Sequence, residues 1–263
     1  MKGCDGSIIP VEVDGKKAYF KFLPQEFKER LEREVRIVKR LKEENCKVPD
    51  YYEQDGQVIF EQGEEVYYAS YEVPGTPAYL NMNFDLLKEI MVELAKMHKV
   101  LRTIPLEGKK ESDINRFRKF YEKNKNFFQR QGFSNKIERV LEREYEEEEY
   151  SYIHADINFK NIFVENNHIT SFIDFTDLRI GYLEDDLGKL FQNILYLDLT
   201  DEELEELIKV YEQELGQKVN RKNLLVSILF RIMYRYFGFV KNKEGNIEEY
   251  KGKTEQILQK IGG

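Results

Sequence analysis

The chain has 263 residues, of which 41% are hydrophobic, 13% aromatic and 34% charged, a composition typical of a folded globular protein rather than a disordered one. The formal net charge of −8 argues against nucleic acid as the main partner, because phosphate backbones attract basic surfaces. Two Cys and three His, widely scattered, exclude a disulfide framework and disfavour a zinc site.

The first predicted element is a β-hairpin. Residues 8–13 and 17–23 are apolar-rich runs joined by an Asp-Gly pair, which is a strong signal for a tight turn. Lys21 lies inside the second strand. Before the hairpin, the glycines of residues 3–7 would let backbone amides approach phosphates, although a flexible start of the chain explains them equally well.

A helix is predicted next, over residues 25–44, from apolar residues that recur at helical spacing. Glu34 lies next to this apolar stripe rather than on the opposite face. Residues 57–60 and 66–73 indicate two further strands, and the Pro-Gly-Thr-Pro sequence of residues 74–77 ends the pattern.

The following part of the chain is predicted to be mostly helical. Asn83 is typical of an N-cap for a helix whose apolar stripe continues to Leu101, and His98 on that stripe is better explained as a packing residue than as a catalyst. Further helical patterns cover residues 113–130 and 134–148.

A strand–loop–hairpin pattern then carries the most informative residues. Residues 150–153 and 162–164 are short β-branched and aromatic runs, separated by a polar loop. An Asn-Asn turn leads into a returning strand over residues 169–175. Asp156 and Asn161 therefore bracket a loop, and the hairpin carries Asp174 back beside Asn161.

These residue types suit phosphoryl transfer. The reaction requires little covalent chemistry from the protein, which must orient a hydroxyl, accept its proton and hold Mg²⁺ on the nucleotide phosphates. Asp156, Asn161 and Asp174 supply one carboxylate, one amide and a second carboxylate for these tasks. The alternative is an ordinary polar loop, because Asp and Asn are favoured in loops in any case.

The sequence His-x-Asp-x4-Asn, followed by Ile-Asp-Phe, resembles the aminoglycoside phosphotransferase and choline kinase family of protein-kinase-like small-molecule kinases. The resemblance implies that Asp156 is the catalytic base, that Asn161 and Asp174 are metal ligands, and that His154 organises the loop. One departure is Ala155, where family members commonly have Gly.

The resemblance also implies roles for residues earlier in the chain. Ala-Tyr-Phe-Lys21 has the form of the kinase strand whose Lys pairs with the nucleotide phosphates and with a Glu of the next helix, for which Glu34 is the candidate. The stretch before residues 74–77 corresponds to the hinge that binds the nucleotide base. Its backbone groups belong to Ser70, Tyr71, Glu72 and Val73.

After the hairpin, an Asp-Asp-Leu-Gly sequence begins another helix, and Asp186 matches the family residue that braces the catalytic loop. Negative charge at a helix N-terminus is the simpler explanation. Helices over residues 200–216, 221–240 and 247–261 would form the substrate side of the protein. Carboxylates suited to an amine-bearing alcohol are those of Glu184, Asp185, Asp198 and Asp201. An anionic or aromatic acceptor would instead use Arg231, Tyr234 and Arg235.

The sequence thus predicts an α+β, protein-kinase-like two-lobed fold with a small β-rich N-lobe (residues 1–73) and a larger, mostly helical C-lobe (residues 74–263). The predicted activity is transfer of the γ-phosphate of ATP or GTP, with Mg²⁺, to a small-molecule alcohol. An aminoglycoside is the first candidate, and choline, ethanolamine, another amino alcohol or a sugar are alternatives. A nucleotide-binding pseudokinase is a rival, while a protein kinase is disfavoured because Asp-Phe-Gly and Ala-Pro-Glu sequences do not follow Asp174.

The predicted surroundings follow from composition. The longest apolar-rich run, residues 224–230, is far shorter than the roughly twenty residues that a membrane helix needs. The first residues are also short of apolar side chains, so no signal peptide is expected. These observations predict a cytoplasmic protein without a membrane or nucleic-acid partner, as a monomer or a weak homodimer. The negative charge is compatible with a cationic substrate, although most of it is expected on solvated helix surfaces.

Overall fold

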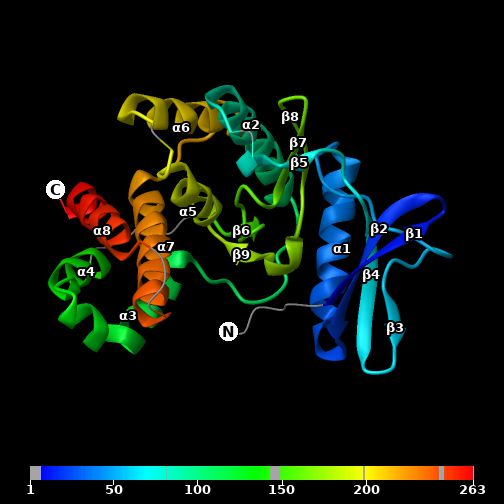
Figure 1. Ribbon diagram of the computed structural model, residues 1–263, viewed down its shortest axis with the longest axis horizontal. Coiled ribbons are helices and arrows are strands. Elements are labelled where there is room, and N and C mark those ends of the chain that lie inside the picture. Colours follow the sequence, from blue (N-terminus) through cyan, green and yellow to red (C-terminus); the bar gives the residue numbers. More distant parts are fainter. Residues whose placement is uncertain (1–6, 81, 143–148, 198, 243–245, 263) are drawn as a thin grey trace. The chain divides into compact units, whose positions relative to one another are not determined.

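Strands are concentrated near the start and the middle of the chain, whereas helices dominate the remainder, as expected of an α+β protein (Figure 1). This computed structural model describes residues 7–80, 82–142, 149–197, 199–242 and 246–262. Its contacts define two compact units. The first unit comprises Met1–Ile104, Phe159–Leu178 and Lys209–Leu215. The second unit comprises Pro105–Asn158, Arg179–Ile208 and Gly216–Gly263. The predicted lobe boundary after Val73 lies inside the first unit and stays a prediction.

The first unit contains an antiparallel sheet with strand order β1-β2-β4-β3. Its strands are β1 (Ser7–Val13), β2 (Lys16–Pro24), β3 (Phe60–Gln62) and β4 (Glu65–Tyr71). The β1–β2 turn has positive φ at both Asp14 and Gly15, 51° and 73°, which is the backbone that an Asp-Gly hairpin turn requires. The predicted hairpin is therefore confirmed.

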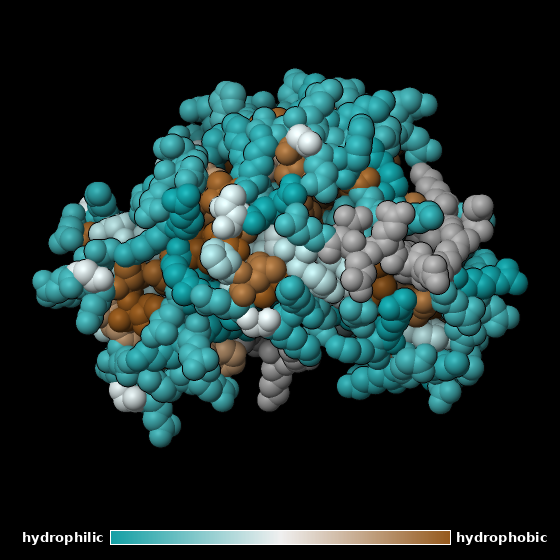
Figure 2. Space-filling model, turned by 180° about the vertical axis from the view of Figure 1, so that it is seen from behind, coloured by the Kyte–Doolittle hydropathy of each residue, from teal (hydrophilic) through white to brown (hydrophobic). Residues whose placement is uncertain are grey.

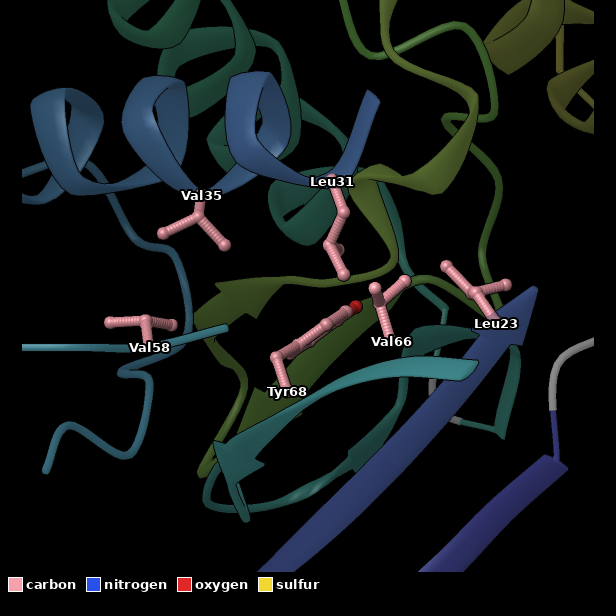
Figure 3. Close-up of a cluster of buried hydrophobic side chains, with 6 residues drawn as sticks. All are labelled: Leu23, Leu31, Val35, Val58, Val66 and Tyr68. Atoms are coloured by element: carbon pink, nitrogen blue, oxygen red, sulfur yellow. The ribbon is translucent and has the colours of Figure 1, made fainter. Parts of the chain in front are cut away.

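Helix α1 (Lys28–Glu43) covers one face of this sheet, after a 3₁₀ turn, η1 (Gln25–Phe27). Figure 3 shows Leu31 and Val35 of α1 directed toward the sheet, where Val66 and Tyr68 of β4 meet them. Leu23 and Val58 complete this cluster of buried side chains. Burial of each such aliphatic side chain stabilises the fold by roughly 1.5–3 kcal/mol.

A second sheet of the first unit has strand order β5-β7-β8. Its strands are β5 (Thr76–Pro77), β7 (Ile162–Glu165) and β8 (His168–Phe172). The β7–β8 turn has positive φ at Asn166 and Asn167, 51° and 63°, as the Asn-Asn sequence predicts. Helix α2 (Phe84–Leu101) begins at the predicted N-cap, where the Asn83 side chain accepts a hydrogen bond from the Leu86 amide at 2.9 Å.

The second unit is mainly helical. A two-stranded sheet pairs β6 (Ser151–Ile153) with β9 (Arg179–Gly181). The helices are α3 (Asp113–Arg130), α4 (Ser134–Leu141), α5 (Leu183–Ile194), α7 (Arg221–Asn242) and α8 (Ile247–Gly262). Helix α6 (Asp201–Leu215) begins in the second unit and ends in the first. Its predicted capping box is present, because the amides and side chains of Thr200 and Glu203 bond reciprocally at 2.8 and 3.2 Å.

Helix α7 is the central helix of the second unit. It packs against both α5 and α8. By length and composition it could cross a membrane, and 56% of its most apolar window is buried inside the protein. On the face shown in Figure 2, hydrophilic side chains predominate, in keeping with the charged composition of the chain.

Several predicted boundaries need correction. The strand predicted over residues 57–60 forms at Phe60–Gln62, and the strand predicted over residues 169–175 ends at Phe172. The second difference arises because Asp174 has a left-handed backbone, with φ 63°, which cannot continue a strand. Within the predicted helix 134–148, residues 143–148 lie outside the described part of the chain, as does most of the predicted phosphate loop, residues 3–6.

Candidate active site

Lys21 is the central cation of the first unit's candidate site. It lies in β2, opposite Tyr68 of β4, and only 13% of its side chain is exposed. Its ammonium lies 2.8 Å from Oδ1 of Asp174 and also donates to the Thr176 hydroxyl. Lys21 therefore contacts one of the two predicted metal ligands directly.

Thr176 is a residue that the sequence analysis missed. Its hydroxyl donates to Oδ1 of Asp174 at 2.7 Å, so it joins the Lys21 ammonium and the Asp174 carboxylate in one cluster. Arg30 of α1 fixes the same 3₁₀ turn, η3 (Phe175–Asp177), by binding the Thr176 carbonyl and Asp177, the latter at 3.0 Å. These contacts hold Asp174 in its left-handed conformation.

Glu34 does not form the predicted ion pair with Lys21 in the described structure. Its side chain is buried in the first unit, where it accepts hydrogen bonds from Tyr68 at 3.1 Å and from Tyr51 at 3.5 Å. Burial raises the pKa of Glu34 to about 7, against the opposing effects of Lys21 and the Tyr68 hydroxyl. Burial disfavours the charged form of Glu34, whereas Asp174 offers Lys21 a more exposed carboxylate.

The predicted metal ligands lie at adjacent strand ends of the first unit. Asn161 immediately precedes β7, and its carbonyl accepts a 2.9 Å hydrogen bond from the amide of Ile173, the residue before Asp174. One amide and one carboxylate are donors that suit Mg²⁺, which usually takes one or two protein carboxylates and completes its shell with water and substrate phosphates. The residues present therefore fit this ion.

The predicted base-binding stretch includes the end of β4. The amides of Tyr71 and Glu72 donate to the carbonyls of Asp50 and Lys17 at 2.8 and 2.9 Å. The prediction is corrected for these two amides, because the fold already uses them. Recognition of the nucleotide base by the backbone groups of Ser70 and Val73 stays a prediction. The Glu72 side chain accepts a 2.7 Å hydrogen bond from the Tyr19 hydroxyl.

In the second unit, Asp186 of α5 holds the start of the candidate catalytic loop. Its two carboxylate oxygens accept the amides of His154 at 2.8 Å and Ala155 at 2.6 Å, and all three residues are buried. Ala155 has φ 67°, in the region that favours glycine, which is the physical reason for a Gly at this position of the family pattern. His154 accepts the Asp156 amide through Nδ1 at 3.3 Å.

Asp156 follows this braced turn. Its Oδ1 lies 2.9 Å from the ammonium of Lys189, and its Oδ2 accepts a 3.1 Å hydrogen bond from the Asn158 side chain. Asn158 also bonds the Asp156 carbonyl at 2.9 Å. Lys189 was not among the predicted site residues. Its position three residues after Asp186 is the one sequence signal that both side chains face the same loop.

A buried charge network lies at the base of α5. Asp113 accepts from Arg179, Arg231 and the Ser227 hydroxyl, each at 2.8 Å. Asp185 accepts the amide of Asp113 at 3.1 Å and pairs with Arg179 at 3.2 Å. Burial, and then the negative charge of Asp113, raise the pKa of Asp185 to about 7. Asp185 and Arg231 are both engaged in this interior network, and their contact with a substrate stays a prediction.

The other candidate substrate residues differ in accessibility. Glu184 is 6% exposed and accepts the amide of Asn220 at 3.0 Å, which leaves little surface for a ligand. The Arg235 guanidinium donates to the Tyr250 hydroxyl at 3.2 Å. Tyr234 is 58% exposed, and Asp201 is exposed at the start of α6. Asp198 lies outside the described residues.

His98 is fully buried in the first unit, where its Nδ1 lies 2.6 Å from the Tyr211 hydroxyl. This contact agrees with the predicted packing role. A groove of about 1020 Å³ lies between α1 and residues 56–61. Charged residues make up half of its lining, and the groove contains none of the predicted site residues.

The sequence matches a known family, and the fold matches solved structures. A model of the phosphotransferase enzyme family matches residues 9–219. No curated protein sequence matches the chain. Among solved structures, an amicoumacin kinase in complex with AMP-PNP, Ca²⁺ and Ami is 13% identical, with a TM-score of 0.71 over 99% of this chain and 86% of that one.

Two further structures are similar to the same extent. The aminoglycoside phosphotransferase APH(4)-Ia, solved with ADP and hygromycin B, is 13% identical, with a TM-score of 0.65 over 98% of this chain and 95% of that one. The APH(2")-IIia complex with GDP and kanamycin is 14% identical, with a TM-score of 0.67 over 97% and 89% of the two chains. These likenesses confirm the predicted protein-kinase-like fold, and the family match covers most of the sequence. The chain therefore belongs to the phosphotransferase enzyme family.

Proposed function

We propose that this enzyme transfers the γ-phosphate of ATP or GTP to a hydroxyl of a small molecule, with an aminoglycoside as the first acceptor to test. The observation that carries the proposal is the braced turn at Asp156. Asp186 holds the two preceding amides, while Lys189 and Asn158 each hold one oxygen of the Asp156 carboxylate. A carboxylate held in this way is suited to orient an acceptor hydroxyl and accept its proton.

The first unit supplies the residues for the nucleotide. Lys21 presents a largely buried ammonium, which is suited to nucleotide phosphates, and Asn161 and Asp174 would hold Mg²⁺. The bound ion would neutralise charge on the phosphates during transfer. The nucleotides in the amicoumacin kinase, APH(4)-Ia and APH(2")-IIia structures support this assignment, as does the Ca²⁺ in the first of them.

The acceptor class is proposed from the relatives and from charge. Hygromycin B and kanamycin, in the APH(4)-Ia and APH(2")-IIia structures, support an aminoglycoside, and the net charge of −8 is compatible with a cationic ligand. Among the candidate substrate residues, exposed Asp201 could meet an amine, and exposed Tyr234 could pack against a ring. Choline, ethanolamine, other amino alcohols and neutral sugars belong in the same test.

The test is a panel of these acceptors with ATP and with GTP, run on the wild type and on Asp156→Ala. We expect the substitution to lower turnover by about 10² to 10⁴-fold, the usual contribution of a general base. Asp85→Ala is the control, because that side chain is 83% exposed at the start of α2. Turnover of Asp156→Ala within about threefold of the wild type would remove Asp156 from its assigned role.

A further inference from the structure

Lys189 is a cation in contact with the carboxylate of the proposed base. Its ammonium lies 2.9 Å from Oδ1 of Asp156, and the two side chains are 20% and 29% exposed. Asn158 donates to the other oxygen, Oδ2, at 3.1 Å. The two oxygens of one carboxylate are therefore held by different residues, one from the loop itself and one from α5. These two contacts restrict rotation of the carboxylate about its side-chain bonds.

Helix α5 is a rigid support for this contact. Lys189 follows Asp186 by three residues, so the two side chains project from the same face of the helix. Asp186 holds the backbone of the turn, and Lys189 holds the side chain that the turn presents. A Cβ at Gly188, between them, would lie 2.1 Å from the Ser227 hydroxyl of α7, which shows how closely the two helices pack.

We propose that Lys189 is a positioning residue, which fixes the Asp156 carboxylate in the orientation that accepts the proton of the acceptor hydroxyl. This inference rests on the proposed function. A general base must meet its proton at hydrogen-bond distance and in line, and misplacement by about 1 Å costs on the order of 10²-fold in rate. Lys189 acts through Asp156 and is not assigned a contact with the nucleotide.

The experiment compares Lys189→Met and Lys189→Arg with the wild type, using the acceptor that the panel identifies. We expect Lys189→Met to lower kcat by about 10 to 100-fold while the nucleotide KM stays within about twofold, because orientation of the base affects the chemical step and not nucleotide binding. Lys189→Arg retains a cation and should recover most of kcat.

Lys253→Met is the matched control. Lys253 is also in the second unit, its side chain is 17% exposed, and it pairs with Glu249 at 3.2 Å and donates to the Leu195 carbonyl at 2.8 Å. The Lys253→Met substitution therefore removes a comparable ion pair at a position that does not contact Asp156. Equal losses of kcat in Lys189→Met and Lys253→Met would overturn the proposal, as would a Lys189→Arg enzyme no faster than Lys189→Met.

A kinetic double-mutant cycle separates this inference from the proposed function. In the Asp156→Asn background, Lys189→Met should change the residual turnover by less than about twofold, because the group that it positions is absent. A further loss as large as in the wild type would show that Lys189 acts independently of Asp156. If Asp156→Ala reduces turnover and Lys189→Met does not, only the role of Lys189 fails. If Asp156→Ala has no effect, the proposed function fails first.

Discussion

Replacement of Glu34 by Gln should change how the stability of the protein depends on pH. Glu34 is 2% exposed, and burial raises its pKa from 4.5 to about 7. The charged groups that act on it are Lys21 and Arg30, which lower its pKa, and Asp174, which raises it, while the Tyr68 and Tyr51 hydroxyls donate to its carboxyl. The folded protein therefore binds a proton at Glu34 over a pH range in which the unfolded chain does not.

The sign follows from this difference in bound protons. A carboxyl with a raised folded-state pKa contributes stability that is fully present below pH 4.5 and is lost as the pH rises through about 7. A shift of about 2.5 pKa units corresponds to about 3 kcal/mol of unfolding free energy. Gln is neutral throughout and can still accept from Tyr68, so Glu34→Gln should lack this loss.

Urea unfolding of both proteins between acidic and mildly alkaline pH is the assay, followed by far-UV circular dichroism because the chain contains no Trp. The advantage of Glu34→Gln over the wild type should grow by about 3 kcal/mol from below pH 4.5 to above pH 7. Glu32→Gln is the control on the same helix, since it removes a carboxyl from a side chain that is 53% exposed. A pH dependence of Glu34→Gln no different from that of Glu32→Gln would refute the effect assigned to burial of the Glu34 carboxyl.

Two further substitutions test other parts of the fold. Asp113→Asn should destabilise the protein by about 3–5 kcal/mol in urea unfolding, because Arg179 and Arg231 would keep their buried charges without the carboxylate that they bind. Wild-type stability of Asp113→Asn would show that Asp113 does not neutralise the two arginines as described. Gly75→Ala should cost about 2–5 kcal/mol, since φ is 92° and the new Cβ would lie 2.1 Å from the Val164 carbonyl oxygen of β7. An unchanged thermal midpoint for this variant would contradict the close approach of the two backbones.

The elements that the sequence predicted well are those with local signals. The Asp-Gly turn, the Asn83 cap and the capping box of Thr200 and Glu203 each depend on residues within four positions of one another. Strand limits were less accurate, because the end of β8 depends on the left-handed backbone of Asp174, which contacts with Lys21 and Thr176 support. No short-range pattern encodes those contacts.

The candidate site shows the same division. The order of His154, Asp156, Asn161 and Asp174 was visible in the sequence because the reacting groups lie on one loop and one hairpin. The ion-pair partners of the site residues could not be predicted from the sequence. Among 41 basic residues, the sequence did not specify that Lys21 would bind Asp174 rather than Glu34, or that Lys189 would bind Asp156. Those pairings depend on burial and on contacts more than thirty positions apart.

The three consecutive carboxylates at the start of α5 show why charge pattern alone could not assign roles. Negative charge at a helix N-terminus interacts favourably with the helix dipole, and this was the simplest explanation from the sequence. Successive residues on a helix point about 100° apart, so each carboxylate meets a different neighbour. Glu184 accepts the amide of Asn220, Asp185 joins the network of Asp113, and Asp186 holds the turn before Asp156. Because the three side chains point in different directions, one acidic run makes three separate structural contacts. The contact made by Asp186 is the one that supports the proposed catalytic base.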